Sequence, residues 1–242
     1  MTDTTDSRPL AGRLTLVTGA SRGIGAATAI ELARDGAHVV LVARSVPDLE
    51  AVEEKIHAVG GSATIAPLDL TDGESIGRLA KAIGERWSAL DVLVLNAATL
   101  GTLAAVPAID TKEFARQLTL NIASTQALIA AFDAMLRQSA DARVIALSTG
   151  VAAGAPRAYW GAYGASKAAQ DVLVSAYGQE VARISKIRTH IVNPGPTRTT
   201  MRARAYPGED PATLKTPDVV GRAIADLVAS DAADGTRVDL PR

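Results

Sequence analysis

The residues best suited to acid–base chemistry lie in the stretch STGVAAGAPRAYWGAYGASK, which runs from Ser148 to Lys167. It holds two adjacent hydroxyls, Ser148 and Thr149, and two tyrosines, Tyr159 and Tyr163. A phenol has an ordinary pKa of about 10, and a cation within about 4–6 Å lowers that pKa toward neutrality. Residues four apart in a helix lie on the same face, one turn apart. Of the chain's four tyrosines only Tyr163 has a lysine, Lys167, four residues on, so we expect this pair to exchange protons with a substrate.

On its own, this stretch can be an acid–base site or an ordinary glycine- and alanine-rich loop that leads into a helix. A tyrosine and a lysine four residues apart also occur by chance on the surface of an ordinary helix. The two hydroxyls stand at the end of a predicted strand and just after it, and neighbouring strand residues point to opposite faces of a sheet. We therefore expect only one of Ser148 and Thr149 to face a substrate.

Strand and helix patterns alternate along almost the whole chain. Short β-branched runs, typical of buried strands, alternate with segments of helical periodicity such as Ile24–Arg34 and Phe114–Arg137. This alternation predicts an α/β fold, a Rossmann-like doubly wound parallel sheet between two layers of helices. The predicted strands are Arg13–Thr18, His38–Ala43, Ala63–Pro67, Asp91–Leu95, Arg143–Ser148 and Ile187–Val192.

The domain organisation follows from the same alternation of strand and helix patterns. We expect residues 1–9 to form a loose tail and residues 10–242 to form one domain. The segment 198–217 follows a strand end and mixes Met201 and Tyr206 with Pro207, Gly208 and Pro211. Ligands bind beyond the carboxyl ends of parallel strands, so this segment is predicted to be a mobile loop with one short helix over the substrate.

The bulk composition excludes several classes of protein and site. Basic and acidic residues number 25 and 26, so charge favours neither nucleic acid nor an anionic membrane as a partner. The absence of cysteine removes disulfides, thiolate nucleophiles and cysteine metal ligands, and the three histidines lie far apart in sequence. No apolar run reaches the ~20 residues of a membrane span, and the polar N-terminus has no signal pattern. We expect a cytoplasmic protein without a bound metal.

A glycine-rich turn follows the first predicted strand. Gly19, Gly23 and Gly25 stand between that strand and a predicted helix. Glycines at these positions allow a tight turn and close backbone approach, and the N–H groups of the helix N-terminus attract a pyrophosphate. Such a turn alone is also compatible with a purely structural role. Its position after the first strand of an alternating chain favours a dinucleotide site.

The charge at the end of the second strand indicates which dinucleotide binds. An acidic residue there binds the ribose 2′-hydroxyl of NAD, whereas an arginine accommodates the 2′-phosphate of NADP. This strand ends in Arg44 without a carboxylate, and Arg22 stands in the glycine turn. The sequence therefore predicts NADP(H), although Arg44 as a plain solvated charge is the alternative.

Taken together, these motifs resemble the ordinary single-domain branch of the short-chain dehydrogenase/reductase family over about residues 13–200. Two departures stand out, since Leu95 and Ala98 replace an Asn and a Gly of the family's Asn-Asn-Ala-Gly turn, and no glycine-rich turn follows Gly235. The matching segments are Thr18–Gly25, Asp69–Asp72, Asn96–Ala98, Asn121, Tyr163–Lys167 and Pro194–Thr197.

The resemblance implies an NADP(H)-dependent oxidoreductase that interconverts a ketone or aldehyde and an alcohol by hydride transfer. Tyr163 would be the general acid and base, Lys167 would lower its pKa and bind the nicotinamide ribose, and Asn121 would hold a proton-relay water. The family's substrate-orienting hydroxyl favours Thr149 over Ser148, while an insertion within 151–158 would restore Ser148. The alternative is a non-catalytic NADP(H)-binding sensor or scaffold on the same fold.

The resemblance also implies the cofactor contacts and the assembly. A homodimer or homotetramer acting on a small-molecule carbonyl or alcohol substrate is expected. The implied cofactor contacts are Gly19, Ser21, Arg22, Gly23, Ile24, Gly25, Arg44, Asp69, Leu70, Asn96, Ala97, Tyr163, Lys167, Pro194, Gly195 and Thr197.

Overall fold

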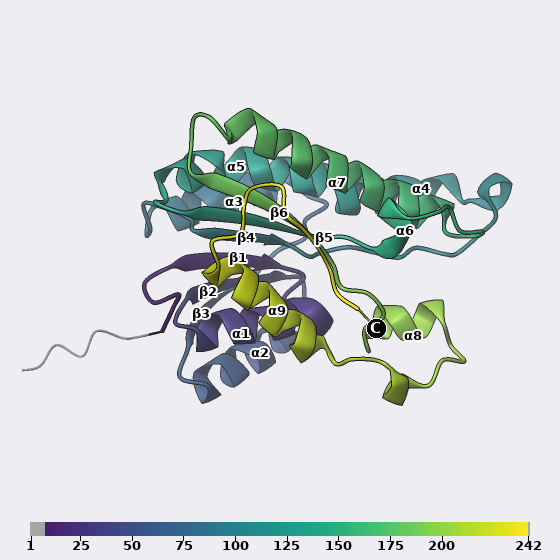
Figure 1. The fold of residues 1–242 in the computed structure, drawn as a ribbon, viewed down its shortest axis with the longest axis horizontal. Coiled ribbons are helices and arrows are strands. Elements are labelled where there is room, and N and C mark those ends of the chain that lie inside the picture. The colour runs from purple at the N-terminus through teal and green to yellow at the C-terminus, as the bar shows by residue number, and fades with distance from the viewer. Residues whose placement is uncertain (1–7, 242) are drawn as a thin grey trace, which may run out of the picture.

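In the computed structural model, which describes residues 8–241, a seven-stranded parallel sheet runs in the order β3-β2-β1-β4-β5-β6-β7 (Figure 1). The six predicted strands are confirmed, and both ends of each strand lie within one residue of the predicted ends. The seventh strand was not predicted, because it has only three residues and is half exposed. The strands are β1 (Leu14–Thr18), β2 (His38–Ala43), β3 (Ser62–Pro67), β4 (Val92–Leu95), β5 (Ala142–Leu147), β6 (Ile187–Asn193) and β7 (Arg237–Asp239).

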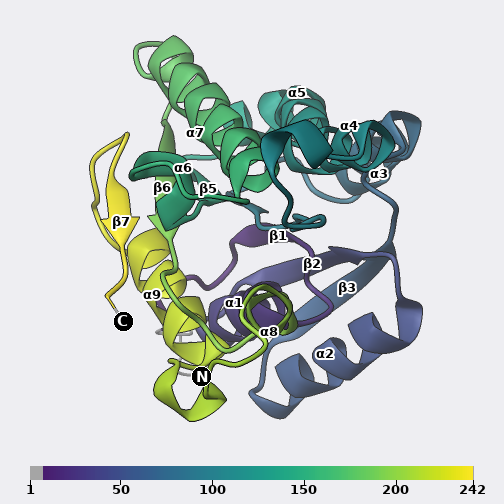
Figure 2. The same ribbon diagram turned by 90° about the vertical axis from the view of Figure 1, so that its right-hand side faces the viewer.

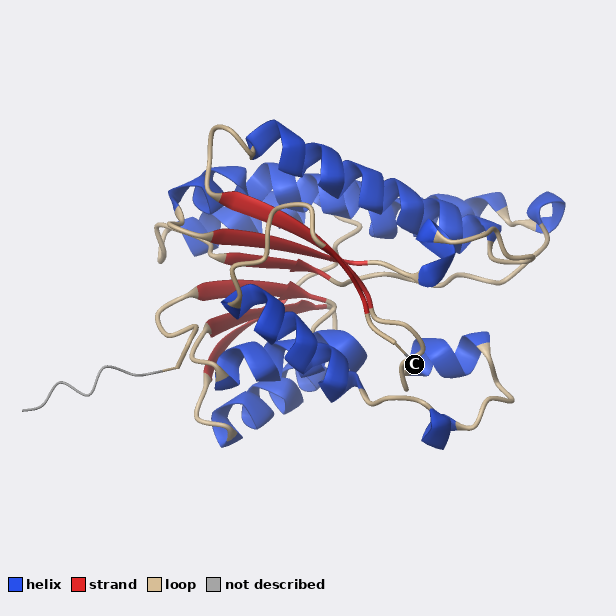
Figure 3. Cartoon of the chain, viewed as in Figure 1, coloured by secondary structure: helices blue, strands red, loops and turns tan. Residues whose placement is uncertain are grey.

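Helices cover both faces of the sheet, which confirms the doubly wound fold (Figure 3). Apolar side chains of the central strands, such as Val17 and Leu16, alternate between the two helix layers and are fully buried. One layer contains α1 (Gly23–Arg34), α2 (Val46–Ala58) and α9 (Pro217–Ala229). The other contains α3 (Gly73–Gly84), α4 (Thr111–Leu118), α5 (Ser124–Gln138) and α7 (Gly161–Val181). No helix of residues 8–241 combines the length and apolar character needed to span a bilayer.

The long helix predicted over Phe114–Arg137 is present, but it is not regular. It begins at Thr111, where the Asp110 side chain caps it by accepting a 2.7 Å hydrogen bond from the Glu113 N–H. Between α4 and α5 the backbone forms one π turn, Thr119–Ala123. Turns of this kind insert one extra residue and occur often at functional sites.

The segment 198–217, predicted as a mobile loop with one short helix, contains a short helix and also a 3-10 turn. A parallel bridge pairs Thr197 with Lys215, and the Arg198 N–H donates to the Lys215 carbonyl at 2.9 Å. These contacts close the base of the loop beside β6. Its elements are α8 (Thr200–Ala205), a 3-10 turn η3 (Pro211–Thr213) and the first residue of α9.

The remaining short elements also stand beyond the carboxyl ends of strands. They are η1 (Val106–Ala108), which follows β4, and α6 (Gly150–Ala153), which follows β5. At the other end of the chain, the predicted tail falls mainly outside the described residues. Arg8, which is described, donates a 3.0 Å hydrogen bond to the Gly60 carbonyl.

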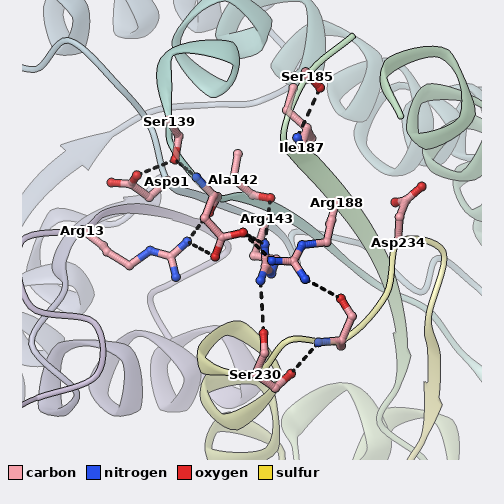
Figure 4. A network of polar contacts seen from close by, with 12 residues as sticks. Arg13, Asp91, Ser139, Ala142, Arg143, Ser185, Ile187, Arg188, Ser230 and Asp234 are labelled. Atoms are coloured by element: carbon pink, nitrogen blue, oxygen red, sulfur yellow. Dashed lines mark hydrogen bonds and ion pairs between the residues drawn. The ribbon is translucent and has the colours of Figure 1, made fainter. Parts of the chain in front are cut away.

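A polar cluster joins the opposite, amino ends of the central strands (Figure 4). The guanidinium of Arg143, only 1% exposed, pairs with the Asp141 carboxylate, and Arg188 reaches the same oxygen at 2.6 Å. Arg13 donates to the Asp141 carbonyl and lies 3.5 Å from its second carboxylate oxygen. Arg143 also donates to the Ser230 carbonyl at 3.1 Å. One carboxylate thus neutralises guanidiniums from three strand ends.

We predict that Asp141→Asn destabilises the fold by about 2–3 kcal/mol, because it leaves the buried Arg143 without its counter-ion. The loss stays below that of a fully buried pair, since the side chain of Asp141 is 41% exposed. Urea denaturation would measure it. As a control, Asp226→Asn removes a carboxylate that is 66% exposed and should cost no more than about 0.5 kcal/mol. Equal losses in the two variants would contradict this account.

Candidate active site

A cavity of about 600 Å³ opens at the carboxyl edge of the sheet, the side that faces the viewer in Figure 2. Its walls come from the glycine turn, the ends of β4, β5 and β6, the start of α7, and α8. It brings together residues that are up to 216 positions apart in the sequence, from Ile24 to Leu240. The predicted site residues that line it are Ile24, Asn96, Ser148, Thr149, Tyr163, Lys167, Pro194, Gly195 and Thr197.

Tyr163 and Lys167 lie on the buried face of α7, 8% and 1% exposed. The Tyr163 hydroxyl lies 4.0 Å from the Met201 sulfur, and the Tyr163 ring packs edge-on against Trp160 with centroids 6.0 Å apart. The Lys167 ammonium donates to the side-chain carbonyl of Gln170. Because Gln170 in turn donates to the Leu95 carbonyl at 3.4 Å, the lysine is linked to the end of β4.

The expected lowering of the Tyr163 pKa by Lys167 is not found in this arrangement. Burial raises the pKa of Tyr163 to about 12, and the negative charge of Asp171 adds to the increase. Burial also lowers the pKa of Lys167 to about 8, against the opposing effect of Asp171. Loss of hydration is thus the main cause of the raised pKa of the phenol.

The adjacent hydroxyls Ser148 and Thr149 have different surroundings. Ser148 is 4% exposed, and its hydroxyl donates a 2.6 Å hydrogen bond to the Asp171 carboxylate. Thr149 lies at the N-cap of α6, half exposed, and its side chain makes no capping hydrogen bond. The Ser148 hydroxyl is therefore directed toward α7, whereas the Thr149 hydroxyl keeps its hydrogen-bonding capacity beside the cavity.

Asn121 lies in the π turn and is fully buried. Its side-chain oxygen accepts from the Thr99 N–H at 2.8 Å, and its amide donates to the Thr99 carbonyl at 3.0 Å and the Ser166 hydroxyl at 2.9 Å. The side chain therefore ties the segment after β4 to α7 behind Tyr163. The main-chain carbonyl of Asn121 lies 3.4 Å from the Thr125 hydroxyl.

The glycine turn fits closely against the end of β4. A Cβ atom on Gly25 would lie 2.3 Å from the Gly19 carbonyl oxygen, and one on Gly19 would lie 2.8 Å from the Asn96 amide. Asn96 donates to the Thr18 and Gly19 carbonyls at 2.8 and 3.2 Å, while its N–H and that of Ala97 donate to the Thr18 hydroxyl. The amide of Asn96 thus holds the turn in place.

The first turn of α1 presents its backbone N–H groups beyond this turn. Gly23 begins the helix with a φ of +58°, a left-handed conformation that favours glycine. Arg22, the N-cap, makes no side-chain capping bond, and Ser21 beside it is half buried. A helix end without a side-chain cap and with a positive dipole suits an anionic group.

The residues predicted to bind the adenosine half stand at the next strand ends. Arg44 follows β2 and Asp69 follows β3, and both side chains are exposed, whereas Leu70 is buried. The Asp69 carboxylate accepts from the Thr71 N–H and hydroxyl at 2.9 and 2.8 Å. These two bonds, assisted by the charge of Arg44, lower the pKa of Asp69.

The turn Pro194–Thr197 closes the cavity next to β7. Gly195 has a φ of +61°, and a Cβ atom there would lie 2.6 Å from the Leu240 carbonyl oxygen. The Thr197 hydroxyl donates to carbonyls of its own turn, Pro194 and Gly195, at 3.3 and 3.2 Å. The residue that follows β7 therefore packs against the turn that is predicted to touch the nicotinamide.

Sequence reasoning missed Asp171, which lies between Ser148 at the end of β5 and Arg237 on β7. Its carboxylate accepts from Ser148 and forms a 3.1 Å ion pair with Arg237. The helical spacing offered a signal, because Asp171 follows Lys167 by four residues, as Lys167 follows Tyr163. No such spacing marked Trp160, Gln170 or Arg157, which contact Tyr163, Lys167 and Tyr206 respectively. Met201 and Tyr206 were expected near the substrate as part of the segment 198–217, and both line the cavity.

Comparison with known proteins places these features in one family. YciK of Escherichia coli K12, described as an uncharacterized oxidoreductase, is 35% identical over 208 residues, which cover 85% of this chain and 81% of YciK. A protein of Escherichia coli CFT073, solved in complex with NADPH, is 33% identical at a TM-score of 0.91 and covers 96% of this chain and 98% of its own.

An alcohol dehydrogenase of the archaeon Thermococcus sibiricus, solved in complex with 5-hydroxy-NADP, has a TM-score of 0.84 and 28% identity, covering 94% of this chain and 95% of its own. The family model for short chain dehydrogenases matches residues 13–210. That match spans the glycine turn, the π turn and the Tyr163–Lys167 pair, and so the chain belongs to the short-chain dehydrogenase family.

Proposed function

We propose that the protein is an NADP(H)-dependent oxidoreductase that interconverts a ketone or aldehyde and an alcohol. The observation that carries the proposal is the convergence of Tyr163, Lys167 and Thr149 on one cavity beside the glycine turn. A buried phenol, a buried ammonium and a hydroxyl beside the same cavity are the groups that carbonyl reduction needs.

The residues present fit a dinucleotide phosphate. The contacts at Gly19 and Gly25 leave no room for a side chain and hold the turn tightly against the end of β4. Beyond that turn, the N-terminus of α1 has no side-chain cap, which suits an anionic group. Gly19, Gly23 and Gly25 would hold the pyrophosphate, Arg22 and Arg44 the 2′-phosphate, and Lys167 the nicotinamide ribose. The turn Pro194–Thr197 would contact the nicotinamide, and the solved relatives that contain NADPH or 5-hydroxy-NADP support this assignment. When bound, NADPH supplies the hydride that adds to the carbonyl carbon.

The chain's own residues handle the oxygen and its proton. The Thr149 hydroxyl donates a hydrogen bond to the carbonyl oxygen and fixes its direction. Tyr163 donates its phenolic proton to that oxygen as negative charge develops there, and the product is the alcohol. The cationic Lys167 stabilises the phenolate left behind, and a proton from solvent restores the phenol. In the direction of alcohol oxidation the same residues act in reverse.

Burial of Tyr163 and Lys167 gives both residues the protonation states that carbonyl reduction needs near neutral pH. With a pKa of about 12, Tyr163 stays protonated and is ready to donate a proton in reduction. With a pKa of about 8, Lys167 is charged at neutral pH and loses its charge in mildly alkaline solution. The charge of Lys167 therefore sets the alkaline limit of activity in reduction.

Tyr163→Phe should retain NADPH binding and lose kcat/KM in carbonyl reduction by about 10²- to 10⁴-fold, because it removes the proton donor. The rate of NADPH oxidation with a panel of ketones and aldehydes measures this loss. Tyr159→Phe is the matched control, since Tyr159 is 63% exposed and should leave the rate nearly unchanged. Wild-type activity in Tyr163→Phe would sink the assignment, and NADPH binding without turnover on any carbonyl would favour a sensor or scaffold.

Asp171→Asn should move the alkaline limb of the reduction profile to lower pH. Asp171 raises the pKa of Lys167, which is about 8, so its removal lets Lys167 lose its charge at a lower pH. The measurement is kcat/KM against pH, with thermal unfolding to verify folding. Glu180→Gln, which removes an exposed carboxylate from the same helix, should leave the limb in place. A limb that stays near the wild-type position in Asp171→Asn contradicts the role given to Lys167.

Arg44→Ala should raise the dissociation constant for NADPH by about 10- to 100-fold, since it removes a charge-assisted contact to the 2′-phosphate. Binding of NADH, which lacks that phosphate, should change little. Titration of both cofactors by calorimetry gives the two constants. Arg78→Ala, on the exposed face of α3, serves as the control. Tighter binding of NADH than of NADPH by the unaltered protein would overturn the cofactor assignment.

A further inference from the structure

The charged side chains around the cavity are all cations. Among the described residues, the charged groups that line it are Lys167, Arg157 and Arg202, and no aspartate or glutamate lines it. The chain as a whole has a net charge of −1, so this excess is local. Lys167 has the buried Asp171 one turn further along α7. Of the two arginines, Arg157 lies between α6 and α7, and Arg202 lies on α8.

The two arginines differ in what neutralises them. Arg202 forms a forked ion pair with Glu209, with N–O distances of 2.5 and 2.6 Å, and its guanidinium lies 3.7 Å from the Tyr206 ring centroid. Arg157 has no carboxylate within ion-pair distance in residues 8–241. Its contacts are with aromatic groups, since it donates to the Tyr206 hydroxyl and lies 5.3 Å from the Tyr206 ring centroid.

The position of Arg157 is set by rings rather than by an opposite charge. Its guanidinium carbon also lies 5.8 Å from the Trp160 centroid, and Trp160 stacks on Tyr206 with centroids 5.6 Å apart. Guanidinium has five N–H donors in a planar fork, and only one is committed to the Tyr206 hydroxyl. The stacked rings orient the plane of this fork while most of its donors stay open to a ligand.

We propose, resting on the proposed function, that the substrate is a carbonyl compound carrying an anionic group, a carboxylate or a phosphate, which Arg157 binds. Trp160 lies between the two ends of such a molecule, since its ring contacts Tyr163 at 6.0 Å and Arg157 at 5.8 Å. The carbonyl lies at Tyr163, the carbon skeleton packs along Trp160, and the anion meets the fork of Arg157. A planar or short apolar spacer matches the aromatic wall.

The test uses para-formylbenzoate and its methyl ester, which differ in charge but hardly in shape. Binding of each to the protein, with and without NADP⁺, is measured by calorimetry, and NADP⁺ provides no hydride for reduction. The acid should bind about 10- to 100-fold more tightly than the ester, as expected for a charge-assisted contact. Arg157→Gln should bring this ratio close to one. Arg157→Lys should keep part of it, because a point charge lacks the planar fork.

Arg204→Gln is the matched control, since Arg204 lies on α8, is exposed and does not line the cavity. It should keep the wild-type ratio of acid to ester binding. A third ligand, para-formylphenyl phosphate, decides between the two anions according to which binds more tightly. Acid and ester that bind alike, an acid that does not bind, or an equal drop of the ratio in Arg157→Gln and Arg204→Gln would overturn the inference. Preferential binding of the acid with no turnover of any carbonyl sinks the proposed function alone.

Discussion

A backbone contact too close for any side chain fixes the crevice between β1 and β4. A Cβ atom on Gly25 would lie 2.3 Å from the Gly19 carbonyl oxygen, and the Asn96 amide donates to that same carbonyl at 3.2 Å. The strand order turns from β1 toward β4 at this point, which is where open α/β sheets bind their ligands. Packing within the chain therefore sets the shape of the turn. The turn in turn fixes the direction of the α1 dipole and the position of one wall of the cavity.

The opposite wall is α7, and its polar residues face inward at a cost in hydration. Tyr163, Lys167 and Asp171 follow one another at four-residue steps, so they form one line on the helix face against the sheet. Charges there remain tolerable because each has a partner. Lys167 has Gln170, and Asp171 has Ser148 and Arg237. The C-terminal strand β7, which carries Arg237, thereby takes part in the electrostatics of the site although it lies at the edge of the sheet.

Much of the fold could be predicted from the sequence, because strands buried on both faces must be apolar throughout. The half-exposed β7 lacks that signature, and the π turn around Asn121 has no signal in residue types. The Tyr163–Lys167 pair could be predicted because helical spacing is local. The direction of the Tyr163 pKa could not, since it depends on burial beneath Trp160 and Met201, and Met201 is 38 residues away.

The two adjacent hydroxyls show how long-range contacts decide what local spacing leaves open. Strand alternation required that Ser148 and Thr149 point different ways, but it did not say which way each one points. The partner that decides is Asp171, 23 residues further along the chain. A hydroxyl that donates at 2.6 Å to a buried carboxylate has its only proton committed there and cannot donate it to a carbonyl oxygen as well. This contact supports the proposal that Thr149, rather than Ser148, is the hydroxyl that orients the substrate, and it makes Ser148 a link between β5 and α7.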